Sequence, residues 1–232
     1  MTRKLQTIGF DADDTLWHNE RFFKLTQERF EELLSDYTDK SLLHERLIAA
    51  ERRNIGHYGF GVKGFVLSMI ETAIDVTDGA VPGHVIRNIL DAGQDMLAHP
   101  IELLPHVRDT VDALAGTYRL VLITKGDLLH QERKLAQSGL GDLFDDVAIV
   151  SDKSVDTYRT VFGRQSGGVE AAMMVGNSLK SDVVPAVSAG SWGVFVPHDL
   201  EWDLEKADAP QSPRFREIAH LGDLPPLVAE IG

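Results

Sequence analysis

Residues Ile8–Trp17 read IGFDADDTLW, and the interpretation of the whole chain starts from this stretch. Leu5–Phe10 is a short apolar run, typical of a buried strand in a parallel sheet. Three carboxylates follow it within four residues, namely Asp11, Asp13 and Asp14. Like charges in a low-dielectric site oppose one another's ionisation, but Mg²⁺, which takes oxygen ligands from carboxylates and waters, would offset that cost. A polar turn after a strand, where Asp is common, is the simpler alternative.

Composition limits the class of protein. At 232 residues the chain can hold one large domain, or one domain with an insertion, and it contains no cysteine for disulfides or a thiolate metal site. Apolar residues at 43% and charged residues at 25% are ordinary for a soluble globular protein. No apolar run approaches the ~18 residues of a membrane span, and the N-terminal MTRKLQTIGFDAD lacks the apolar core of a signal peptide. We therefore expect a cytoplasmic protein.

The charge balance limits the partners. The formal net charge of −13 argues against nonspecific binding to nucleic acid or to an anionic membrane, because both require basic surface. It does not exclude a small anionic substrate, which responds to the local field of its site. We expect a small-molecule partner, no nucleic acid and no membrane, and the sequence leaves the oligomeric state open.

The chain has a helical part followed by an alternating part. Apolar spacing predicts helices over 19–37, 40–54, 65–76 and 82–98, with a glycine-rich loop, HYGFGVKGF, over 57–65. Beyond Pro105 the predicted strands are 118–123, 146–150, 169–175 and 191–196, and the predicted helices are 106–114, 126–138, 154–165 and 180–189. The tail after 196 reads as loop-rich, with 216–219 as a candidate edge strand.

This order predicts an α/β fold with an insertion. Alternating strands and helices indicate a Rossmann-like parallel sheet with helices on both faces and right-handed crossovers. A structureless connection between the first two strands would be implausibly long, so we expect 18–99 to form an α-helical cap domain within a core made of 1–17 and 100–232. Ligands bind at the carboxyl ends of the strands in such sheets, and an inserted domain could cover that edge as a lid.

Polar residues follow each predicted strand of the core. Because the carboxyl ends of parallel strands meet at one edge, these residues should converge. Beyond Asp11 and Asp13 they are Thr124, Asp152, Lys153, Asn177, Ser178 and Asp182.

With these residues in place, the sequence resembles the haloacid dehalogenase-like (HAD) hydrolase superfamily. The D-x-D-x-T-L motif is matched by 11–16, the Thr or Ser after a strand by Thr124, and the Lys that opens a helix by Lys153. The fourth motif, a G-D-S-x-x-x-D-like run, is matched by Gly176, Asn177, Ser178 and Asp182. The resemblance covers roughly 4–17 and 100–200, and a helical cap between the first two motifs matches a subclass of the family.

The resemblance implies a role for each matched residue. Asp11 would attack phosphorus to form an aspartyl-phosphate, and Asp13 would act as general acid and base. Thr124 and Lys153 would contact the phosphoryl group. Mg²⁺ would bind the Asp11 carboxylate, the Asp13 carbonyl and the Asp182 carboxylate.

Some residues depart from the family pattern. Asn177 replaces the first acid of the fourth motif; its amide oxygen can still ligate Mg²⁺ directly or through water, so we expect retained but weaker metal binding. Lys125, where the family often has Asn, is either a phosphate contact or a solvated lysine. Asp14, His18 and Glu20 lie where the small flap and the cap hinge of the family begin, and we expect them to be exposed turn residues.

The resulting functional hypothesis is a Mg²⁺-dependent phosphatase acting on a small phosphorylated metabolite, such as a sugar phosphate or nucleoside monophosphate. The family's 2-haloacid dehalogenases share the aspartate nucleophile, hold no Mg²⁺ and typically lack an Asp at the position of Asp13. That reading remains an alternative, as do a non-catalytic binding member, which Asn177 favours, and a phosphomutase. Candidate specificity residues in the cap are Arg52, Arg53, Tyr58, Phe60 and Lys63.

Overall fold

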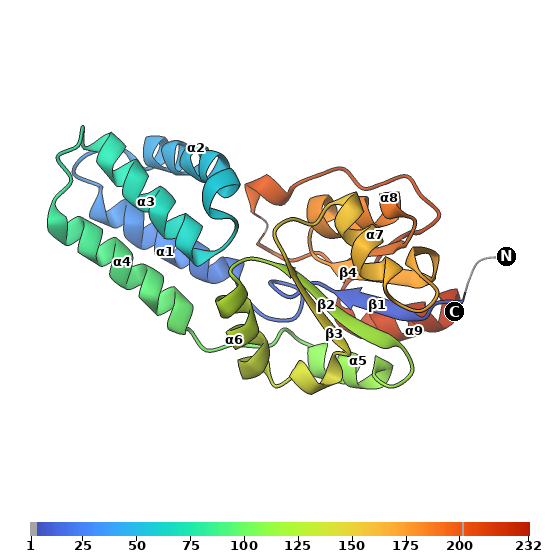
Figure 1. The fold of residues 1–232 in the computed structure, drawn as a ribbon. Helices are drawn as coiled ribbons and strands as arrows, with labels where there is room; N and C mark the ends of the chain where they lie inside the picture. The colour runs from blue at the N-terminus through green and yellow to red at the C-terminus, as the bar shows by residue number, and fades with distance from the viewer. Residues whose placement is uncertain (1–3, 201) are drawn as a thin grey trace. The chain divides into compact units, whose positions relative to one another are not determined.

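The computed structural model describes residues 4–200 and 202–232 (Figure 1). The chain divides into two compact units, which are described separately. The sheet unit comprises 1–20, 101–125 and 131–232, and the helical unit comprises 21–100 and 126–130. The helical unit thus starts three residues later than the expected insertion and takes in a second short segment, 126–130.

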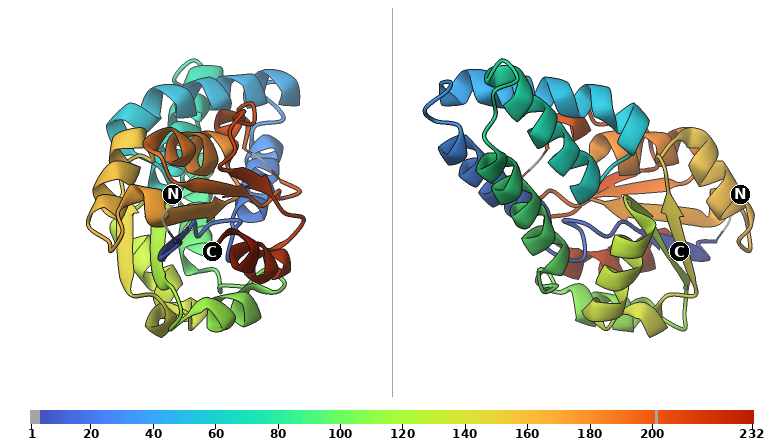
Figure 2. Two further views of the ribbon diagram at one scale, coloured as in Figure 1. Left: turned by 90° about the vertical axis from the view of Figure 1, so that its right-hand side faces the viewer. Right: turned by 60° about the vertical axis from the view of Figure 1, so that its left-hand side comes forward.

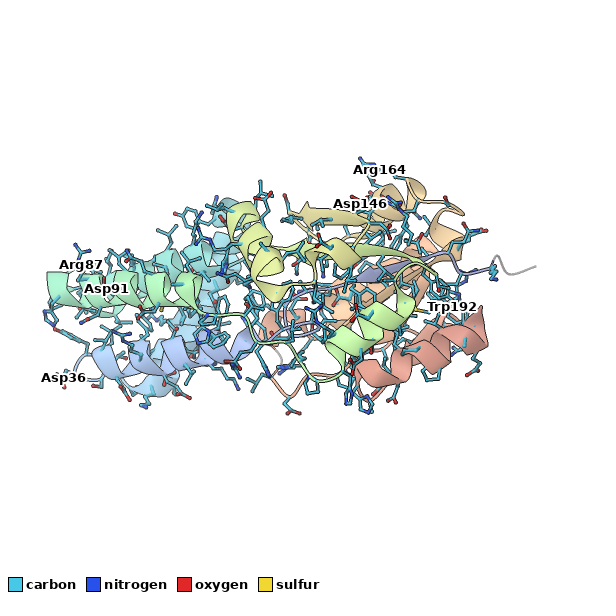
Figure 3. The ribbon with its side chains drawn as sticks, turned by 90° about the horizontal axis from the view of Figure 1, so that it is seen from below. Asp36, Arg87, Asp91, Asp146, Arg164 and Trp192 are labelled. Carbon is cyan, nitrogen blue, oxygen red and sulfur yellow. The ribbon has the colours of Figure 1, made fainter. Side chains whose placement is uncertain are left out.

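The sheet unit is built on a six-stranded sheet in which every pairing is parallel, in the order β3-β2-β1-β4-β5-β6. The strands are β1 (Thr7–Phe10), β2 (Arg119–Lys125), β3 (Asp146–Val150), β4 (Ala172–Gly176), β5 (Trp192–Phe195) and β6 (Phe215–Glu217). Asp146 and Trp192, labelled in Figure 3, are the residues with which β3 and β5 begin. Every residue of β1 and β4 is buried, as expected for central parallel strands. The expected α/β fold is confirmed.

Helices cover both faces of this sheet (Figures 1 and 2). They are α5 (Val107–Leu114), α7 (Val155–Gly163), α8 (Val184–Ala189), α9 (Leu224–Ile231) and, from Gln131 onward, α6 (Leu128–Ser138). Alternate side chains of one strand face opposite ways, so Leu120 and Leu122 pack in the core with α5 and α9, whereas Val121 packs with α7 and α8.

The tail was expected to be loop-rich, and this was wrong for its last part. The helix α9 begins at Leu224, and Pro225 and Pro226 lie in its first turn, where a missing N–H costs nothing. Leu224 and Val228 are buried in the core, which stabilises the helix. The single helix expected over 180–189 is also interrupted: a π-helical turn, Leu179–Val183, precedes α8.

The helical unit contains α1 (Glu20–Leu33) from Arg21 onward, α2 (Lys40–Tyr58), α3 (Val62–Val76) and α4 (Gly83–Ala98) around one apolar core. The loop predicted over 57–65 is mostly helical, because α2 continues to Tyr58 and α3 begins at Val62. The turn between them uses Gly59 and Gly61, both at positive φ. No helix within the two described ranges is long and apolar enough to cross a membrane.

Close helix packing in this unit depends on Gly93 of α4. A Cβ added at Gly93 would lie 2.4 Å from Cγ2 of Val66 on α3, and the branched Val side chain has little rotamer freedom in a helix. We therefore expect Gly93→Ala to destabilise the protein by about 1–3 kcal/mol in urea denaturation. Gly56→Ala is the matched control, because Gly56 of α2 has open space around it, so that Ala there should stabilise by up to about 1 kcal/mol. Equal stability of the two variants would contradict the proposed steric role.

Candidate active site

The centre of the site is an ion triad formed by Asp11, Lys153 and Asp182. Asp11 lies just past β1, and its backbone N–H donates to the Val175 carbonyl of β4 at 2.9 Å. Lys153, between β3 and α7, donates through Nζ to Asp11 Oδ1, and also to Asp182 Oδ1 at 2.6 Å. The lysine side chain is only 2% exposed. One buried ammonium therefore serves two buried carboxylates that come from distant parts of the sequence.

Burial and charge act in opposite directions on this triad. Burial raises the pKa of Asp11 to about 7, against the attraction of Lys153, and the charge of Asp182 adds to the increase. Burial alone would lower the pKa of Lys153, but attraction to Asp11 and Asp182 prevails and raises that pKa above its ordinary value. The lysine therefore stays protonated, whereas the raised pKa of Asp11 reflects the part of the burial cost and of the repulsion from Asp182 that the lysine does not offset.

The turn that carries Asp182 needs a glycine before it. A Cβ on Gly176 would lie 2.2 Å from Asp182 Oδ2, a distance no real side chain allows. With Gly176 there, Oδ2 accepts the backbone N–H of Ser178 at 3.0 Å. The glycine of the fourth motif is thus explained by close approach of the Asp182 carboxylate.

Asn177 and Thr15 complete the surroundings of Asp11. The Thr15 hydroxyl donates to Asp11 Oδ2 at 3.1 Å and accepts the backbone N–H of Asn177 at 3.1 Å. With its nitrogen forward, the Asn177 side-chain amide donates to Asp11 Oδ2 at 3.2 Å and to the Asp13 carbonyl at 3.1 Å. With the amide turned the other way, the Asn177 side-chain oxygen faces Asp11 Oδ2 and the Asp13 carbonyl oxygen, so that three oxygens lie together.

The Asp13 carboxylate lies in a cage of three donors. Oδ1 accepts from Trp17 Nε1 at 2.7 Å and from Lys134 Nζ at 2.8 Å, and Oδ2 accepts from Gln131 Nε2 at 2.8 Å. Burial raises the pKa of Asp13, but Lys134 and the three hydrogen bonds outweigh it, so the pKa is lowered overall. Sequence reasoning missed these donors, although Gln131 and Lys134 are three residues apart on one helix face.

Asp14 was expected to be an exposed turn residue, and this was wrong. It is 7% exposed and adopts a left-handed backbone with φ of 60°. Its carboxylate accepts the backbone N–H groups of Asn19 at 2.8 Å and Glu20 at 2.9 Å, and His198 Nε2 lies 3.6 Å away. Burial raises its pKa to about 6. Asp14 therefore joins the first motif to the residues where α1 begins.

Thr124 and Lys125 end β2, next to the centre of the sheet. The Thr124 hydroxyl is buried and donates to the Lys125 carbonyl at 3.3 Å. Lys125 Nζ donates to Ser181 Oγ at 2.8 Å and to Glu205 Oε1 at 2.6 Å, so it is not a solvated surface lysine. Its contact with phosphate remains a prediction. Glu205 had no sequence signal, because it follows the last motif in an irregular segment.

The candidate specificity residues lie in the helical unit. Lys63 is in the first turn of α3, and its Nζ donates to Asp127 Oδ2 at 2.7 Å. Arg53 donates to Glu71 at 2.7 Å, and Tyr58 ends α2 with an exposed ring. Their role toward a substrate remains a prediction.

The cage around Asp13 leads to a stability prediction for Lys134→Met. This substitution keeps the length of the chain but leaves Asp13 without its cation, and the Lys134 side chain is only 8% exposed. We expect a loss of about 1–3 kcal/mol in urea denaturation, less than for a fully buried pair because Asp13 retains some solvent contact. Lys24→Met is the control, since Lys24 is exposed on α1. If Lys134→Met loses no more free energy of unfolding than the control, the cage contributes nothing to stability.

The chain is similar to known hydrolases in sequence and in fold. Residues 5–190 match the profile of the haloacid dehalogenase-like hydrolases. The chain is 24% identical to the glyceraldehyde 3-phosphate phosphatase of Methanothermobacter thermautotrophicus, covering 84% of this chain and 87% of the relative. A haloacid dehalogenase-like family hydrolase from Xanthomonas campestris has a similar structure, with a TM-score of 0.89 and 41% identity over 98% of this chain and 91% of that one.

The fold is also shared with more distant enzymes. The L-2-haloacid dehalogenase of Xanthobacter autotrophicus superposes with a TM-score of 0.67 at 16% identity, over 98% of this chain and all of the other, which reflects the fold alone. The profile match covers most of the sheet unit and all of the inserted helices. The chain therefore belongs to the haloacid dehalogenase-like hydrolases.

Proposed function

We propose that this hydrolase is a Mg²⁺-dependent phosphatase of small phosphorylated metabolites, with Asp11 as nucleophile. The observation that carries the proposal is the pairing of the buried Asp11 carboxylate with Lys153. A second carboxylate, Asp13, follows Asp11 two residues later in the chain. An ammonium beside the nucleophile reduces its repulsion from a phosphate dianion. The 24% identical relative is named as a phosphatase, which supports the same reaction class.

The chain's own residues suffice to describe both steps. In the first step an Asp11 oxygen attacks phosphorus, and the ester oxygen leaves with a proton from Asp13. In the second step water attacks the phosphorus and gives a proton to Asp13. The bond between Asp11 and phosphorus breaks, which releases phosphate and restores Asp11. Lys153 and Thr124 would hold the phosphoryl oxygens. The donors around Asp13 favour its carboxylate form, which is the form that the second step requires.

The residues present suit Mg²⁺. Among residues 4–200 and 202–232 no three His, Cys, Asp or Glu side chains gather as a metal site. However, the Asp11 carboxylate, the Asp13 carbonyl and an oxygen-forward Asn177 amide would form a hard-oxygen set, with Asp182 beside it. When bound there, Mg²⁺ would orient the phosphoryl group and offset its charge.

A dehalogenase would share the nucleophile but has no use for Asp13 as an acid, because halide leaves without a proton. The presence of a carboxyl group at Asp13, two residues after the nucleophile, therefore favours the phosphatase. We also propose that the helical unit acts as a cap that selects the substrate.

The reaction is tested with 4-nitrophenyl phosphate in Mg²⁺ and in EDTA, and with 2-chloropropionate for chloride release. We expect Mg²⁺-dependent phosphate release that Asp11→Asn lowers on the order of 1000-fold or more. Asp112→Asn, at an exposed position of α5, should leave the rate unchanged. Chloride release without metal would contradict the proposal, as would activity that survives Asp11→Asn. If aryl phosphate is not hydrolysed, a screen of sugar phosphates and nucleoside monophosphates decides between a selective enzyme and a binding protein.

Asn177 gives a separate test of the metal site. Asn177→Asp adds a carboxylate to the oxygen set, so we expect Mg²⁺ to bind about tenfold tighter in calorimetry, since ligand charge tunes affinity. The metal-free variant should be less stable than the wild type in urea, because the amide donors are lost and a like charge is added. Asn88→Asp, on α4 of the helical unit, adds the same charge elsewhere and should change neither quantity. Unchanged Mg²⁺ affinity in Asn177→Asp would place the metal away from this residue.

A further inference from the structure

Glu205 is a half-buried carboxylate at the edge of the sheet that the four motifs do not explain. It ends a short 3-10 turn, Asp203–Glu205, in the irregular segment between β5 and β6, and its side chain is 17% exposed. Oε1 accepts from Lys125 Nζ at 2.6 Å. Oε2 accepts from Ser178 Oγ at 2.6 Å and from Ser181 Oγ. Three donors, one from the end of β2 and two from the turn after β4, thus converge on one side chain.

The hydrogen bonds around Glu205 form a closed network. Lys125 Nζ also donates to Ser181 Oγ at 2.8 Å, while that hydroxyl donates its own proton to Glu205. Ser178 Oγ accepts the backbone N–H of Ser181 at 2.9 Å and donates to Glu205. Both hydroxyls therefore have an acceptor and a donor in consistent directions. A buried network that is satisfied in this way rigidifies the backbone that carries it.

The donors are the immediate neighbours of the proposed catalytic residues. Lys125 follows Thr124 in β2, Ser178 follows Asn177, and Ser181 precedes Asp182. The backbone of 177–183 includes a π-helical turn, which is a rare conformation often associated with functional sites. Backbone N–H groups of Asp182 and Val183 donate to the Ser178 carbonyl within the turn at 2.9 and 3.2 Å. The side-chain network attaches this turn laterally to the end of β2 through Lys125.

We propose that Glu205 is a positioning residue of the active site, which holds the 177–183 turn and the end of β2 in register. Glu205 acts through Ser178, Ser181 and Lys125, and it touches no reacting atom. Asn177 and Asp182 are thereby kept at their distances from Asp11 and Lys153. The catalytic part of this inference rests on the proposed phosphatase function, whereas the structural part does not.

The structural part is tested by amide hydrogen exchange in the full chain. Glu205→Gln replaces one carboxylate oxygen by an NH₂ group, which would face either Lys125 or the two serine hydroxyls. Exchange within 177–183 should therefore accelerate about tenfold or more, because hydrogen bonds to a charged acceptor are the stronger ones. Asp208→Asn, at an exposed position of the same segment, is the matched control and should leave exchange unchanged. Ser181→Ala, which removes one donor and keeps the Lys125–Glu205 pair, should give a smaller change in the same segment.

The catalytic part is tested by kinetics and Mg²⁺ calorimetry on the same variants. We expect Glu205→Gln to lower kcat about tenfold and to weaken Mg²⁺ binding, with KM for 4-nitrophenyl phosphate nearly unchanged, since the residue does not touch substrate. Unchanged exchange in 177–183, or acceleration spread equally over the sheet, would overturn the positioning role. Accelerated exchange with unchanged kcat and Mg²⁺ affinity would reduce Glu205 to a structural tether and so overturn the catalytic part. If exchange in 177–183 accelerates in Glu205→Gln but the wild-type protein has no phosphatase activity, the proposed function is refuted and the structural role of Glu205 stands.

Discussion

The ammonium of Lys153 between the carboxylates of Asp11 and Asp182 is the interaction on which the site depends. Two acids buried at one sheet edge would each oppose the ionisation of the other. The lysine compensates only part of that cost, which is why burial still raises the pKa of Asp11 to about 7. The repulsion that remains between the two carboxylates is a cost that the proposed Mg²⁺ would offset.

The surroundings of the triad consist of hydrogen-bond networks that start from different elements. The cage around Asp13 joins the first motif to α6, and Asp14 joins the same motif to the residues that begin α1. The network of Glu205 joins the end of β2 to the turn after β4. Each network has a charged member that is largely buried and well supplied with partners. Such networks are costly when incomplete, so they hold their loops in one arrangement.

Asn177 stands where the fourth motif of the family has an acidic residue, and this difference changes the charge around Asp11. An aspartate at this position would add a further carboxylate beside Asp11 and Asp182. The amide instead can donate to Asp11 Oδ2 and the Asp13 carbonyl, or present its oxygen to a cation at the same place. One orientation of the amide thus satisfies its hydrogen bonds within the protein, and the other supplies an oxygen to the set proposed to bind Mg²⁺.

The sequence by itself determined the fold class and the strand-end positions of the main acidic and basic residues. Strand periodicity and the order of elements are local properties, and parallel strands bring their carboxyl ends to one edge whatever the loops do. Only the tertiary structure decided the partners of those residues. The burial of Asp14, the cage of Asp13 and the attachment of Lys125 to Glu205 depend on contacts between residues far apart in the chain. The same holds for α9, whose two prolines read as a loop until Leu224 and Val228 are seen packed in the core. Local patterns carry no information on such contacts, because their energy comes from burial and pairing that exist only after folding.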